Sequence, residues 1–100
     1  MDLEHLTAAT FASHRGSLFR VVDAASDGTE LRLIEADELP AQPGAPRAEP
    51  FSLVFTGPAE PRLEQRTYRL DHDELGELDI FLVPIGFAPD GELLYEAVFN

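Results

Sequence analysis

Hydrophobic and polar residues alternate along most of this chain, and that alternation predicts β-strands. Successive side chains of a strand point to opposite faces, so a period of two with charges on one face indicates a half-buried strand. In one segment Leu31 and Leu33 alternate with Glu30 and Arg32. About six segments follow this pattern, at residues 17–22, 29–36, 51–56, 66–72, 77–85 and 93–99.

Residues 1–16 predict a short N-terminal helix that precedes the strands. Thr7 is a favoured N-cap residue, residues 8–15 continue as the helix, and Gly16 supplies the left-handed residue that commonly follows a helix end. The spacing of an apolar residue before the cap and another four positions into the helix is that of a hydrophobic staple. We expect three side chains of this segment to face the body of the protein: Leu6, Phe11 and Ala12.

Residues 40–50 interrupt the alternation with four prolines and a glycine. Proline cannot donate to a strand ladder, so this segment predicts a long surface loop. It does not divide the chain, because neither side alone would build a core. The expectation is one mainly β domain over residues 1–100, an antiparallel meander or barrel of about six strands. The short helix would lie across one opening.

The charge balance restricts the classes of partner. The chain carries 19 acidic and seven basic residues, a formal net charge of −12. Such a surface repels nucleic acids and anionic membranes, so neither is expected as a partner. The chain has no cysteine, which fits the expected cytoplasmic location and excludes disulfides and thiolate metal sites.

All seven basic residues are arginine, and lysine is absent. Codon usage in a GC-rich genome explains this bias without reference to function. An acidic surface suited to high salt, where counterions screen self-repulsion, is a second explanation, and a basic binding partner is a third.

The densest group of chemically active side chains is the stretch 71–79, with one histidine and five carboxylates. A calcium loop that begins at Asp71 fails, because Leu75 and Leu82 occupy two ligand positions. We therefore interpret the stretch as a solvated turn with His72 partly packed. His5 and His14 lie nine residues apart, which is not the spacing of a helical metal pair. No catalytic, metal or cofactor site is predicted.

Two segments suggest protein contacts. The run 80–83 is apolar on both faces, so either the helix or a second protein would cover its outer face. The final strand, 93–99, either lies at an open sheet edge that another chain can extend or pairs with the first strand and closes a barrel. The candidate partner-binding residues are Ile80, Phe81, Leu82, Val83, Tyr95, Val98 and Phe99.

Four segments carry a resemblance to a known family: Pro-Phe-Ser-Leu at 50–53, residues 68–72, residues 75–84 and Tyr-Glu-Ala-Val-Phe-Asn at 95–100. Together with the helical pattern of Phe11, Ala12 and Gly16, they resemble a family of short bacterial domains of unknown function. The resemblance covers nearly the whole chain. It implies an association with phage-tail-like fibre and collar proteins, and it supplies no catalytic residues.

The leading functional hypothesis is a non-catalytic structural or protein-interaction module, an accessory piece of a phage-tail-like or fibre assembly. Its partner would be another protein or a second copy. An alternative is a metal-dependent enzyme that uses His72 with Asp71 or Asp73. A further alternative is a β-barrel that binds a small ligand in a cavity lined by Phe19, Leu31, Phe55, Tyr68 and Tyr95.

Overall fold

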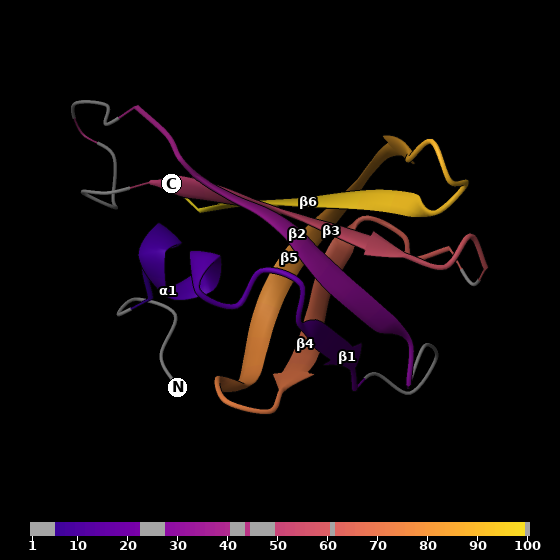
Figure 1. Cartoon of the computed structure of the whole chain (residues 1–100), viewed down its shortest axis with the longest axis horizontal. Helices are drawn as coiled ribbons and strands as arrows, with labels where there is room; N and C mark the ends of the chain where they lie inside the picture. The colour runs from indigo at the N-terminus through magenta and orange to yellow at the C-terminus, as the bar shows by residue number, and fades with distance from the viewer. Residues whose placement is uncertain (1–5, 23–27, 41–43, 45–49, 61, 100) are drawn as a thin grey trace.

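Six strands and one short helix make up the regular structure of the described residues, which are 6–22, 28–40, 44, 50–60 and 62–99 of the computed structural model. The strands form a closed antiparallel barrel in the order β1-β2-β3-β6-β5-β4. Figure 1 shows α1 beside the barrel, close to the ends of β2 and β6. The elements are α1 Ala8–Ala12, β1 Leu18–Val21, β2 Glu30–Glu38, β3 Phe51–Gly57, β4 Arg66–His72, β5 Gly76–Phe87 and β6 Leu93–Phe99.

The fold class predicted from the sequence is confirmed: the chain is mainly β, and its strands close into a barrel. Strands adjacent in sequence pair with each other except across one connection, where the meander prediction is wrong. There β3 pairs with β6, and β4 pairs with β1. The connection between β3 and β4 includes Leu63, which is 1% exposed, and its backbone N–H donates to the Tyr95 hydroxyl at 3.0 Å. This hydrogen bond ties the connection to β6, the strand that lies beside β3 in place of β4.

Both predicted positions of the last strand are wrong, although the barrel does close. β6 lies between β3 and β5, so it is neither a free edge nor the partner of β1. The proline-rich loop predicted for 40–50 lies mostly outside the described residues. Within the described part of the chain, no helix has the length and apolar character required to cross a bilayer.

The inward side chains of the strands fill the barrel. The ring centroids of Phe19 and Phe55 lie 5.3 Å apart at 82°, an edge-on contact. A Cβ atom at Gly57 would come within 2.5 Å of Leu31 Cδ2, so the backbone and this side chain are in close contact. The residues assigned above to a ligand cavity are at most 2% exposed and belong to this packed core. The packing does not favour a cavity there, and ligand binding stays a prediction.

The helix covers one opening of the barrel through Phe11. This ring is fully buried, with centroids 6.4 Å from Phe19, 5.7 Å from Phe51 and 6.2 Å from Phe99. The predicted N-cap is confirmed, because Thr7 Oγ1 accepts from the N–H of Thr10 at 3.3 Å.

The predicted extent of the helix is wrong, because it ends at Ala12. Ser13 forms the C-cap, and the chain turns towards β1 at Gly16, whose φ is +89°. The Gly16 N–H donates to the Leu33 carbonyl at 2.7 Å, which ties the turn to β2. Ala12 is exposed, and Ala8 faces the core instead.

Phe11→Ala is expected to lower the free energy of unfolding by about 3–5 kcal/mol, because it leaves a cavity among three aromatic rings. The matched control is Phe87→Ala at a side chain that is 66% exposed, where a surface substitution should change stability by less than about 0.5 kcal/mol. Chemical denaturation measures both. Equal losses in the two variants would show that the helix does not close the core.

Candidate functional site

The seven residues of the predicted partner-binding surface divide between the inside and the outside of the barrel. Ile80, Leu82 and Tyr95 point into the core, with exposures of 0%, 0% and 1%. They cannot contact a partner unless the barrel opens, so the prediction that these three residues bind a partner is wrong. The alternation of β5 and β6 is the reason, since each strand sends every second side chain inward.

The other four residues lie outside or at the barrel opening. Phe81 and Val98 are each 49% exposed, and Val83 is partly exposed on the same side of β5 as Phe81. Phe99 stacks on Phe51 with ring centroids 4.6 Å apart, so part of its surface is covered within the chain. The helix packs on β2 and β3. The alternative in which α1 covers the outer side of 80–83 is therefore wrong.

Three of these residues, Phe81, Val83 and Val98, belong to a continuous surface across three strands, which we call the outer apolar face. Glu96 of β6 pairs in register with Val54 of β3 and with Val83 of β5. Paired residues of neighbouring strands project from the same side of a sheet, as do residues two apart on one strand. The face consists of Val54, Phe81, Val83, Leu94 and Val98 around Glu96.

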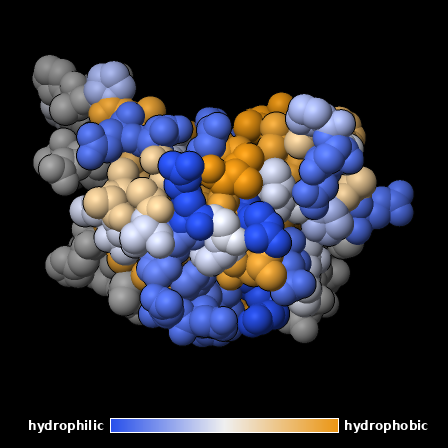
Figure 2. Space-filling view, viewed as in Figure 1, coloured by the Kyte–Doolittle hydropathy of each residue, from blue (hydrophilic) through white to orange (hydrophobic). Residues whose placement is uncertain are grey.

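Further apolar side chains are exposed near the end of β5. Ile85 is 48% exposed at the register shift. Phe87 is 66% exposed, but it pairs with the buried Leu93 and so lies on the other side of the sheet from the outer apolar face. Figure 2 shows a hydrophobic patch in the upper half of the molecule, right of centre, in the region of β6 and the end of β5, with hydrophilic residues on both sides of it. Single exposed apolar residues are ordinary, but contiguous ones indicate an interaction surface.

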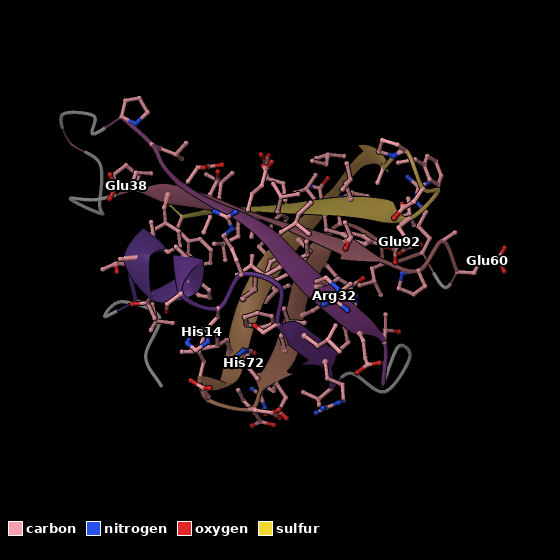
Figure 3. The ribbon with its side chains drawn as sticks, in the orientation of Figure 1. His14, Arg32, Glu38, Glu60, His72 and Glu92 are labelled. Carbon is pink, nitrogen blue, oxygen red and sulfur yellow. The ribbon has the colours of Figure 1, made fainter. Side chains whose placement is uncertain are left out.

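A pair of histidines forms a second candidate site, at the opening between α1 and the β4–β5 turn. Figure 3 shows His14 and His72 side by side there. Their ring centroids are 4.8 Å apart, and the two ring planes meet at 71°. The His72 ring also packs against Phe19, with ring centroids 4.5 Å apart. His72 is only 5% exposed. Sequence reasoning missed this pair, because 58 positions separate the two residues along the chain and only the barrel brings them together.

The hydrogen bonds of His72 determine which ring nitrogen carries the proton. Nδ1 accepts from the backbone N–H groups of Glu74 and Leu75, each at 3.1 Å. Nδ1 is therefore unprotonated, and in the neutral ring the proton lies on Nε2. Nε2 then donates to Ser17 Oγ at 2.9 Å, and that hydroxyl donates to the His14 carbonyl.

This tautomer bears on whether Ser17 and His72 could form a catalytic pair. A serine nucleophile needs a histidine nitrogen that accepts its proton. Here Nε2 carries a proton, and the Ser17 hydroxyl hydrogen is directed at a backbone carbonyl. The arrangement connects the turn after α1 to the β4–β5 turn, and it is suited to structure rather than to nucleophilic attack.

The pKa of His72 lies below its ordinary value. Burial of the ring is the largest cause, and the charge of His14 adds to it. The carboxylates of Glu74, Asp73 and Asp71 act in the opposite direction. His14 Nε2 lies 3.8 Å from Glu74 Oε2, whose side chain is 76% exposed, so this contact is weak. The folded state therefore favours neutral His72.

A shallow hollow of about 360 Å³ adjoins the histidines. Arg20 and Arg32 contribute to its wall, but both are already engaged: Arg20 Nη1 donates to Asp71 Oδ2 at 3.2 Å, and Arg32 Nη1 donates to the Gly16 carbonyl at 2.6 Å. Over the described ranges, no group of three or more histidine or carboxylate side chains is arranged to hold a metal ion. His5 lies outside those ranges.

Lowering the pH from about 7.5 to about 5.5 is expected to reduce the free energy of unfolding. The unfolded chain protonates His72 near its ordinary pKa of 6.5, whereas the folded chain resists protonation. The unfolded state then binds more protons, so stability is fully present above that pKa and is lost as pH falls towards the lower pKa of the folded state.

Denaturant titrations across this range measure the loss, which should be smaller in His72→Asn. Asparagine offers an acceptor near the position of Nδ1 but does not titrate. Aspartate and glutamate titrate mainly below the range, at about pH 4. Parallel slopes in the wild type and the variant would contradict the role of His72.

Nitrogen-15 NMR at about pH 8 should show neutral His72 with its proton on Nε2, because two amide donors occupy Nδ1. Ser17→Ala should leave this tautomer in place, since the two backbone donors remain. A proton on Nδ1 in the wild type would overturn the hydrogen-bond assignment and restore Ser17 as a candidate nucleophile.

Comparison with known proteins identifies the family of the chain and no closer relative. No curated protein matches it, and no solved structure matches it. One family model does, and it covers residues 6–99, which include α1 and all six strands of the described barrel. The chain therefore belongs to the family described as a domain of unknown function, DUF6916.

Proposed function

We propose that this domain is a non-catalytic protein-interaction module that binds a protein partner through the outer apolar face. The observation that carries the proposal is the exposure of Phe81 and Val98, 49% each, on one side of the barrel. Apolar surface left in water on a packed sheet gains free energy when a partner covers it, at about 25 cal/mol for each Å². Because the face lies on a closed six-stranded sheet, its backbone loses little conformational entropy when a partner binds.

The chemistry of the histidine pair supports the non-catalytic part of the proposal. His72 uses both ring nitrogens in hydrogen bonds to the protein. A general base needs a free lone pair within reach of a substrate. His72 could provide one only by giving up contacts that connect two turns of the barrel.

We extend the proposal to an accessory component of a phage-tail-like or fibre assembly, located in the cytoplasm. The support for the assembly is the sequence resemblance, which is strongest at 50–53 and 95–100. Assemblies of this kind are built from repeated protein contacts, and a binding face on a small rigid barrel suits such a role. Fluorescence of a tagged chain in its native cells would test the location.

The double variant Phe81→Thr/Val98→Thr is expected to lose the partner that the wild-type domain captures from lysate of the native cells. Threonine keeps the strand propensity while it removes the apolar contact area. The matched control is Leu18→Thr, which changes a side chain that is 40% exposed on β1, and it should keep the partner. Quantitative mass spectrometry of the captured proteins measures the loss, with circular dichroism to confirm that each variant is folded.

Light scattering after size exclusion, at low and at molar salt, accompanies this capture. An oligomer of the wild type that the double variant cannot form would identify a second copy as the partner. The proposal fails if the double variant retains every partner of the wild type and every oligomeric form.

A further inference from the structure

Among the six described residues that make up the outer apolar face, Glu96 is the only charged one. Its cross-strand neighbours are Val54 and Val83, and its neighbours two positions away on β6 are Leu94 and Val98. All four of these nearest positions on the same side of the sheet are therefore aliphatic. Glu96 itself is partly buried by them.

The Glu96 carboxylate has no protein partner among the described residues, either as an ion pair or as a hydrogen bond. Two outward strand carboxylates are paired, since Asp71 pairs with Arg20 and Asp79 pairs with Arg69. In the free domain, water solvates Glu96. A wholly apolar partner would remove this water and leave a buried, unpaired charge, which is costly.

We propose that the partner of the outer apolar face presents one lysine or arginine side chain surrounded by apolar side chains, and that this cation pairs with Glu96. The inference rests on the proposed function, because it concerns the same face. The apolar surroundings supply contact area, and the single carboxylate selects a partner whose cation lies at the matching position. A partner without that cation must bury Glu96 unpaired, so the same residue both attracts and discriminates.

A two-fold pair of copies joined through this face does not meet this requirement. A two-fold contact places the same face on both sides, and this face contains no basic residue, so it would bring two Glu96 side chains together. Elsewhere on the domain, Arg20, Arg32 and Arg69 already have partners within the chain, so these three are not free to pair with Glu96 of a second copy. Each copy also carries a formal charge of −12, which opposes association.

The test uses a library of random peptides displayed on yeast as its probe. The library is selected for binding to the wild-type domain and depleted of peptides that also bind Phe81→Thr/Val98→Thr. The surviving peptides depend on the outer apolar face by construction. We expect them to be enriched in a single lysine or arginine with apolar residues on both sides, relative to the unselected library.

The surviving peptides are then titrated against Glu96→Gln and against Glu30→Gln, the matched control. Glu30 is an exposed carboxylate on β2, away from the face, so its removal changes net charge equally. Binding should weaken about fivefold for Glu96→Gln, as expected for a partly screened ion pair, and should stay unchanged for Glu30→Gln.

Three results would overturn the inference. Surviving peptides without basic enrichment would show that the face binds apolar partners and that Glu96 is not recognised, which leaves the proposed function intact. Equal weakening by the two charge variants would show general attraction to an acidic surface. If no peptide depends on the face, the proposed function fails together with the inference.

Discussion

The bend in β5 is the constraint on which the rest of the barrel depends. Residues 76–82 of this strand pair with β4, and residues 83–87 pair with β6. The ladder shifts register between Pro84 and Gly86, where proline has no N–H to donate and glycine adopts a φ of +137°. A straight strand would continue beside β4 and leave β6 without its second neighbour. The bend therefore closes the sheet and places β6 at the centre of the outer apolar face.

Because the barrel is closed, the inward side chains of each strand form the core and the outward side chains form the surface. The inner side chains of β6 pack in the core, and Tyr95 also accepts the Leu63 N–H at 3.0 Å, which ties the β3–β4 connection to β6. At one opening Phe11 lies among Phe19, Phe51 and Phe99. With this opening covered and the interior filled, the outer surface and the turns are the parts of the barrel that remain accessible.

The sequence predicted the local structure well, because alternation and caps are local properties. The strands at 66–72 and 93–99 have the predicted bounds, and Thr7 caps the helix as expected. It did not predict that β3 pairs with β6, since the choice between β4 and β6 depends on how the whole sheet bends. The same limit applies to the candidate sites. Alternation distinguishes Phe81 from Ile80, yet no local pattern brings His14 to His72.

Glu96 illustrates how a functional position can be visible in a structure and absent from the sequence pattern. In the sequence it is an ordinary polar residue between Tyr95 and Ala97, where a charge on the solvent side of a strand is expected. Only the register shows that Val54 and Val83 flank it. A charge between two aliphatic side chains makes nonspecific apolar contacts with this face less favourable. It therefore limits unwanted association of the domain. It follows that the same carboxylate that interrupts the apolar face of the free domain also defines the chemistry that a partner must bring.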